Sequence, residues 1–196
     1  MGFLETADEK AFLWLNGWVG QFPWLDSLAR LVVSDYLAPL VLALVLLGLW
    51  FTGRTATARL RNQHGVIAAA VALGLANLAV EAINQFFFRP RPFVSLHATL
   101  LFYQPVDSSF PANPAAVGFS VAAAVWLWNR KAGAALLAVA TLYALSRVYA
   151  GVLYPLDILG GAAIGVAAAF VATFTVRHFK PLPNLILRIA RYLYLA

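Results

Sequence analysis

Residues 146–161 read Ser-Arg-Val-Tyr-Ala-Gly-Val-Leu-Tyr-Pro-Leu-Asp-Ile-Leu-Gly-Gly and lie between two long apolar segments. Arg147 and Asp157 stand out because the apolar segments of the chain carry almost no other charge. Burying a charged pair costs several kcal/mol unless the charges are matched or functional. Spacing alone leaves two interpretations open: a structural Arg–Asp pair that ties two helices together, or part of a functional site.

The composition identifies an integral membrane protein. Of the 196 residues, 62% are hydrophobic and only 11% are charged, and the mean hydropathy is +0.79. Soluble globular domains are about 25% charged. The length suits one domain. The chain has no cysteine, which excludes a disulfide framework and a thiolate metal site.

The formal net charge of +6 would suggest a nucleic-acid partner for a soluble protein. Here the basic residues lie at the ends of apolar segments, where they meet anionic lipid headgroups and set the orientation. We therefore expect membrane lipids as partners and no nucleic acid. Residues 2–10 are rich in acidic side chains, so they do not resemble a cleavable signal, which begins with a basic region.

Apolar runs predict an all-α, polytopic membrane bundle of about five transmembrane helices with an N-terminal interfacial helix. Three regions are expected: an interfacial amphipathic segment (1–35), a transmembrane core (36–179) and a basic amphipathic tail (180–196). Small residues at 160–165 predict close helix packing in lipid. The predicted spans are 36–52, 65–88, 113–128, 132–149 and 155–176.

The basic residues divide unevenly between the two membrane faces that five spans create. Cytoplasmic loops carry an excess of Lys and Arg, so we expect the richer face to be cytoplasmic. The loop 89–111 and the turn 147–157 would then share the extracytoplasmic face. The richer face holds Arg54, Arg59, Arg61, Arg130, Lys131, Arg177, Lys180, Arg188 and Arg191; the other holds Lys10, Arg30, Arg89, Arg91 and Arg147.

Two further stretches accompany residues 146–161: Arg-Pro-Arg-Pro-Phe at 89–93 and Ser-Ser-Phe-Pro-Ala-Asn-Pro-Ala-Ala at 108–116. Together the three resemble the signature motifs of the type 2 phosphatidic acid phosphatase superfamily. The run at 91–94, His97 and the approach at 107–111 are most similar to bacterial undecaprenyl-diphosphatases. The resemblance covers roughly residues 12–175 and implies a location in the bacterial inner membrane.

The resemblance also implies a chemistry, phosphoryl transfer that uses neither metal nor cofactor. In that family a Lys, arginines and backbone amides hold the phosphate oxygens. A His attacks phosphorus and is oriented by an Asp four residues later on the same helical face. A second His gives the leaving oxygen a proton.

Only part of this machinery matches the present sequence. Arg91 and Arg147 match the phosphate-binding arginines, and Asp157 matches the orienting carboxylate. The Lys position is occupied by Asn84, and the nucleophile position, four residues before Asp157, by Leu153. The second motif reads Pro111-Ala112-Asn113-Pro114, so Ala112 replaces its Ser and Pro114 its acid His. Neither catalytic His position is intact.

These substitutions predict a catalytically degenerate relative that binds a phosphorylated lipid, such as an isoprenoid phosphate or phosphatidate, through Arg91, Arg147, Asn84, Ala112 and Asn113. It would alternatively act as an accessory subunit beside another membrane protein. Two other hypotheses stay open: an active lipid phosphatase that uses unusual groups such as His97, and a purely structural scaffold.

Three local expectations accompany the hypothesis. Asp157, without a His to orient, is expected to pair with Arg147 and to weaken phosphate capture. Pro114 is expected in the first turn of the third span, where a missing N–H group costs nothing. Asn113 is expected to cap that helix.

Overall fold

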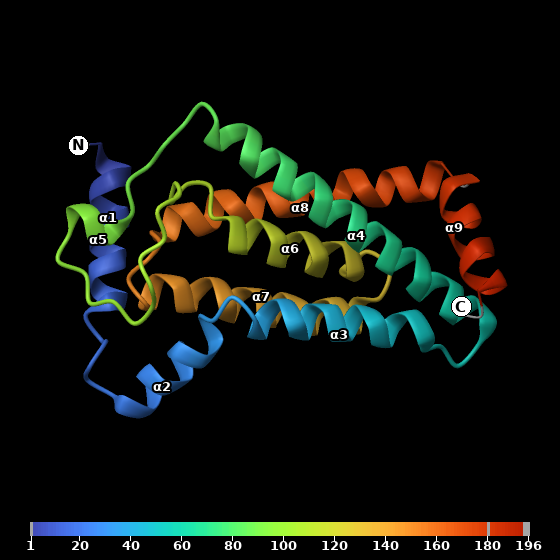
Figure 1. Cartoon of the computed structure of the whole chain (residues 1–196), viewed down its shortest axis with the longest axis horizontal. Helices are drawn as coiled ribbons and strands as arrows, with labels where there is room; N and C mark the ends of the chain where they lie inside the picture. The colour runs from blue at the N-terminus through green and yellow to red at the C-terminus, as the bar shows by residue number, and fades with distance from the viewer. Residues whose placement is uncertain (1, 180, 194–196) are drawn as a thin grey trace.

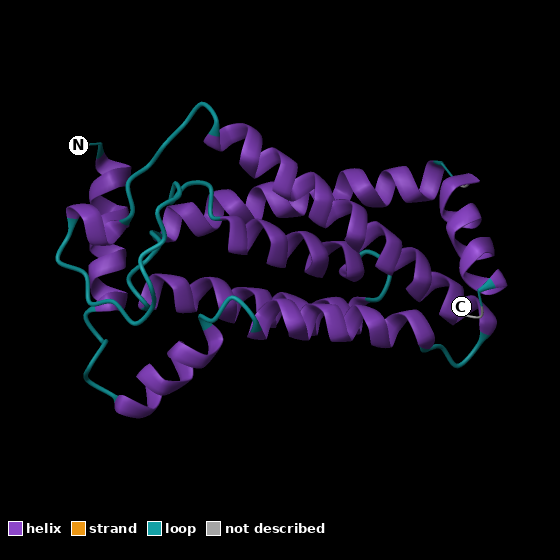
Figure 2. Ribbon diagram, viewed as in Figure 1, coloured by secondary structure: helices purple, strands orange, loops and turns teal. Residues whose placement is uncertain are grey.

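The computed structural model describes residues 2–179 and 181–193, and within them every regular element is a helix (Figure 2). This confirms the all-α prediction. Lys180, which was counted with the basic face, lies outside the described residues. The described helices are α1 (Phe3–Asn16), α2 (Pro23–Val32), α3 (Leu37–Phe51), α4 (Ala56–Asn84), α5 (Pro92–Ser95), α6 (Asn113–Trp126), α7 (Arg130–Tyr149), α8 (Pro155–His178) and α9 (Pro181–Tyr192).

The predicted spans all correspond to helices, but they differ in length. By length and composition α4, α7 and α8 can cross a membrane, and α2 with α3 form a fourth candidate that is bent by 55°. α6 has only 14 residues. By these criteria the described residues hold three candidate spans, or four with the bent pair, and the number of five spans stays a prediction. α4 also begins at Ala56 rather than Gly65, because the Thr55 side chain caps it by accepting a hydrogen bond from the Ala58 amide.

α6 is the central helix and packs against α4, α7 and α8, while α3 lies along α4 and α7 (Figure 1). The core between these helices is built largely from alanine, which allows the helix axes to approach closely. The buried alanines of this core include Ala68, Ala72, Ala122, Ala140, Ala169 and Ala172.

The helices α6 and α8 approach each other closely. A Cβ atom on Gly165 would lie 2.3 Å from the Ala116 carbonyl oxygen, and one on Gly161 would lie 2.3 Å from the Ala112 carbonyl oxygen. No side chain fits at these two positions without moving the backbone of α6. The close packing predicted from the small residues at 160–165 is confirmed.

Short elements cross the two ends of the bundle. α1 and α5 lie at one end, which we call the α1 end, and α9 crosses the other, the α9 end (Figure 1). α1 buries one side, formed by Asp8, Phe12 and Asn16, against the bundle. The Asn16 amide nitrogen donates to the Thr99 and Tyr149 carbonyl oxygens, both at 2.9 Å. The interfacial location of residues 1–35 stays a prediction, as does that of the tail.

The topology brings the three sequence motifs to the α1 end. The loop between α4 and α6 and the turn between α7 and α8 both lie there (Figure 1). The α3–α4 and α6–α7 connections lie at the α9 end instead. The sequence predicted this meeting of distant segments.

Candidate functional site

The turn between α7 and α8 places the third motif. Gly151 ends α7 in a left-handed conformation, with φ of 88°. The Gly151 and Val152 amides donate to the Val148 and Arg147 carbonyl oxygens at 3.0 and 3.1 Å. This pattern is a Schellman motif, which favours glycine because its left-handed residue has no Cβ to clash. The chain reverses within four residues and enters α8 at Pro155.

Asp157 is fully buried at the start of α8. One carboxylate oxygen accepts the Tyr154 amide at 2.9 Å, and the other accepts the Arg89 guanidinium. Arg89 also binds Asp8 of α1 at 2.8 Å. The expected pair between Asp157 and Arg147 is therefore wrong: Asp157 belongs to a network that we call the Asp8–Arg89–Asp157 triad.

The triad contains two buried carboxylates and one guanidinium, so it carries one excess negative charge. The N-terminus of α8 offsets this charge, because the Leu156 amide donates to Asp8 at 2.9 Å. Burial lowers the pKa of Arg89, but hydrogen bonds and charges from Asp8 and Asp157 outweigh it and hold the pKa above its ordinary value. Arg89 therefore stays charged and clamps α1 to α8.

Arg147 is buried in a different set of contacts. Its guanidinium donates to the Asp35 carboxylate and, at 2.6 Å, to the Tyr143 hydroxyl. It also lies over the Phe102 ring, 4.7 Å from the centroid. Its Nε atom is buried and has no partner among the described residues. The Asp35 side chain is 44% exposed, so this ion pair opens toward the surface.

Arg91 ties the long loop to the α7–α8 turn. Its Nε and Nη2 atoms donate to the carbonyl and carboxylate oxygens of Asp107 at 3.0 and 2.9 Å. Its Nη1 atom donates to the Val152 carbonyl oxygen at 3.0 Å. These contacts give Arg91 a structural role in addition to any role in phosphate binding, which stays a prediction.

The second motif begins α6. The helix starts at Asn113 with Pro114 in its first turn, as predicted, but the cap position is Ala112, so the expectation that Asn113 caps the helix is wrong. The Ala112 amide donates to the Asp157 carbonyl oxygen at 3.0 Å. Because the Ala112 amide donates to this carbonyl oxygen, it is not free to bind a phosphate. Asn113 is the polar side chain in the run from 111 to 114.

A cavity of about 200 Å³ lies beside this helix start, between α3, α6 and α7. Its polar lining residues are Asp35, Asn113 and Tyr143, and Pro114 also faces it. Because Asp35 and Tyr143 both bind Arg147, the cavity adjoins that guanidinium. We call this the Arg147 cavity.

Leu153, at the position of the family's nucleophile, is only 2% exposed. It packs in an apolar cluster with Phe12 of α1, Ala112 and Val148. An aliphatic side chain in an apolar environment therefore occupies the position that the resemblance assigns to a histidine.

The remaining predicted residues lie apart from these contacts. Asn84 ends α4, and its side-chain oxygen is buried without a partner among the described residues. His97 is exposed in the loop after α5 and makes no hydrogen bond within the described part of the chain. Neither residue is joined to Arg91 or Arg147 by a described contact.

Sequence reasoning missed Asp8, Arg89, Asp35 and Tyr143. A signal existed for Asp8, since Asp8, Phe12 and Asn16 recur every four residues and so share one helical face. Arg89 stands two residues before the arginine of the first motif, and the resemblance assigns it no role. Asp35 has no local signal, because only the bend between α2 and α3 brings it to Arg147.

The chain has several relatives among known proteins. A model of the PAP2 superfamily matches residues 65–180. The chain is 34% identical over 170 residues to the putative undecaprenyl-diphosphatase YbjG of Escherichia coli strain K12, covering 86% of this chain and 82% of that protein. It is 30% identical over 166 residues to undecaprenyl-diphosphatase BcrC of Bacillus subtilis strain 168, covering 84% and 82%.

Two solved structures have a similar fold. LpxE of Aquifex aeolicus has a TM-score of 0.63 at 27% identity, covering 83% of this chain and 92% of that one. The first transmembrane PAP2 type phosphatidylglycerolphosphate phosphatase from Bacillus subtilis also has a TM-score of 0.63, at 19% identity, covering 92% and 88%. At this lower identity the second structure shows the fold alone.

Proposed function

The chain belongs to the PAP2 superfamily, and from this premise we propose that it binds a phosphorylated lipid in the membrane without hydrolysing it. The proposal rests on one observation: Leu153, four residues before Asp157, is buried in an apolar cluster. Losing a nucleophile costs many orders of magnitude in rate. The carboxylate that would orient a His is bound to Arg89 instead.

The proton donor that the family reaction needs for its leaving group is also missing from its expected position. The leaving oxygen needs a proton, and the position that would supply it is occupied by Pro114, which has no side-chain proton to give. Among the described residues, His97 forms no hydrogen bond with Arg147 or Asp157 and does not line the Arg147 cavity. The described residues thus offer neither a nucleophile nor an acid in the family's arrangement.

Binding is supported by the Arg147 cavity. A phosphate group that enters beside Asn113 would displace the half-exposed Asp35 carboxylate and accept hydrogen bonds from the planar guanidinium of Arg147. The cavity lies between α3, α6 and α7, and we propose that a phosphate attached to a lipid chain enters it at the α1 end. The names of the relatives favour an isoprenoid phosphate as the lipid.

The competing candidate is an active undecaprenyl-diphosphatase, which the names of relatives at 34% and 30% identity favour. It requires an unrecognised nucleophile, for which His97 is the candidate. To distinguish the two functions, phosphate release from undecaprenyl diphosphate is measured with the purified wild type and with the His97→Ala variant. We expect no release above the buffer rate from either; release that His97→Ala abolishes overturns our proposal.

Binding is measured separately with undecaprenyl phosphate. Arg147→Gln should weaken it at least about tenfold, since a hydrogen bond to a charged group contributes about 1.5–3 kcal/mol. Arg30→Gln is the matched control, because Arg30 is exposed on α2 at the same end of the bundle. Equal affinity of the Arg147→Gln variant and the wild type would show that the cavity does not hold the phosphate.

We further propose that the α1 end faces the extracytoplasmic side of a bacterial inner membrane. The uneven distribution of basic residues supports this orientation.

A further inference from the structure

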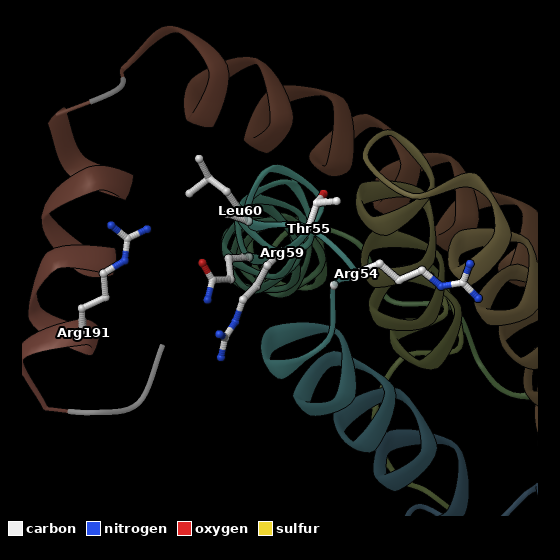
Figure 3. A pocket seen from close by; sticks show the side chains of 8 residues that line it. Arg54, Thr55, Arg59, Leu60 and Arg191 are labelled. Carbon is white, nitrogen blue, oxygen red and sulfur yellow. The ribbon is translucent and has the colours of Figure 1, made fainter.

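A second cavity lies at the α9 end, far from the Arg147 cavity. It has a volume of about 510 Å³ and is enclosed by the α3–α4 loop, the first turns of α4, and α9 (Figure 3). Its polar lining residues are Arg54, Thr55, Arg59, Gln63 and Arg191. We call it the basic cavity.

No acidic side chain among the described residues neutralises the arginines of the basic cavity. Figure 3 shows Arg191 projecting from α9 toward α4, which carries Arg59, while the Arg54 side chain extends away from Arg191. The Nε atom of Arg59 is buried and has no partner among the described residues. Neither Arg59 nor Arg191 forms an ion pair within the described part of the chain.

The distribution of carboxylates explains why these arginines stay unpaired. Every acidic side chain of the sequence lies at or near the α1 end, so none is available at the α9 end within the described residues. Unneutralised arginines that face one cavity attract an external anion, and the guanidinium fork suits phosphate oxygens. The acidic residues are Glu5, Asp8, Glu9, Asp26, Asp35, Glu81, Asp107 and Asp157.

A separate apolar cavity of about 550 Å³ is lined by residues that neighbour those of the basic cavity in the sequence. It lies between α3, α4 and α9, and its lining includes Leu47, Trp50, Phe51 and Ala190. Ala190 and Arg191 are consecutive residues of α9, so one helix lines both cavities. A cationic cavity beside an apolar one matches a ligand with a charged head and a hydrocarbon chain.

We propose that the α9 end binds an anionic glycerophospholipid, with its phosphate between Arg59 and Arg191 and an acyl chain against Trp50 and Phe51. The site is separate from the Arg147 cavity and independent of the function proposed there. Its ligand bridges α4 and α9, so it also holds α9 onto the bundle.

The test uses the purified full-length chain in detergent, titrated with phosphatidylglycerol or phosphatidylcholine and followed by native mass spectrometry. We expect phosphatidylglycerol to bind at least about tenfold more tightly, because its headgroup is anionic and attracts the two guanidinium groups, whereas the phosphatidylcholine headgroup has no net charge. The double variant Arg59→Gln with Arg191→Gln should remove this preference. Arg61→Gln is the matched control, since Arg61 is exposed on the same helix and does not line the cavity.

Three results would overturn the proposal. The first is equal affinity of the wild type for the two lipids, a comparison that needs no variant to fold. The second is an equal loss of preference in Arg61→Gln, which would indicate general surface charge. The third is that inorganic phosphate at equal concentration displaces phosphatidylglycerol, which would identify a free-anion site that does not use the apolar cavity.

Discussion

At the scale of single residues, the neighbours of Asp157 determine what its carboxylate binds. Asp157 occupies the position from which the family orients a histidine, but with Leu153 four residues earlier it caps α8 and binds Arg89. An acidic residue near a helix N-terminus is stabilised by the helix dipole. The Asp157 carboxylate therefore stabilises the start of α8 and the contact with Arg89.

The triad predicts a large effect of Arg89→Gln. The substitution leaves two buried carboxylates, Asp8 and Asp157, without their cation, which costs about 3–5 kcal/mol. Thermal unfolding in detergent should show a markedly lower Tm. Arg30→Gln, exposed on α2, should leave the Tm unchanged.

Adding Asp8→Asn to Arg89→Gln removes one of the unpaired charges and should recover part of the lost stability. A double variant no more stable than Arg89→Gln alone would mean that the triad does not couple α1 to α8.

At the scale of elements, the contact between α6 and α8 decides whether the α1 end is assembled. α6 is too short to be placed by the membrane alone, so its position depends on packing against α4, α7 and α8. Gly161 and Gly165 let the α8 backbone reach the Ala112 and Ala116 carbonyl oxygens. The Arg147 cavity begins at the N-terminus of the helix that this contact positions.

The same contact predicts that Gly165→Leu is destabilising. A larger side chain there must push α6 away, and overpacking costs about 1–3 kcal/mol. Ala163→Leu is the matched control, because Ala163 lies two residues away on the exposed side of α8. Thermal unfolding of both variants measures the difference; equal Tm values would show that α6 and α8 do not pack as closely as described.

At the scale of the whole molecule, charge is separated along the long axis. The acidic side chains belong to elements at or near the α1 end, where five basic residues accompany them, while the helix ends and loops at the α9 end carry only basic ones (Figure 1). This asymmetry is the basis for the proposed orientation, and it also leaves the basic cavity without counter-ions. The uneven distribution of charged residues therefore supports both the proposed orientation and the proposed lipid site.

The orientation predicts the outcome of cysteine labelling, for which the chain is suited because it has no native cysteine. Val106→Cys places a thiol at the α1 end, where Val106 is 95% exposed, and Thr57→Cys places one at the α9 end. In intact spheroplasts a membrane-impermeant maleimide should label only the first. After permeabilisation it should label both, and the reverse pattern would invert the proposed topology.

Much of this architecture was predictable from the sequence. Hydrophobic runs predict helices because each run must satisfy its backbone groups internally in lipid. The three motifs predict the family, and the small residues at 160–165 predict the close packing of α8. The early start of α4 was not predicted, because the cap at Thr55 extends the helix into a polar stretch, whereas the end of α6 at Trp126 lies within two residues of the predicted end.

The sequence by itself determined that the chain is an all-helical membrane protein of this superfamily, since hydropathy and motif identity are properties of residue types. Only the tertiary structure decided which charges pair: Asp157 with Arg89 and Asp8, and Arg147 with Asp35. The reason is that charge interactions depend on distance and burial. The partners are 68, 81 and 112 residues apart in the sequence and meet only through the packing of α1, α2 and the long loop onto the bundle.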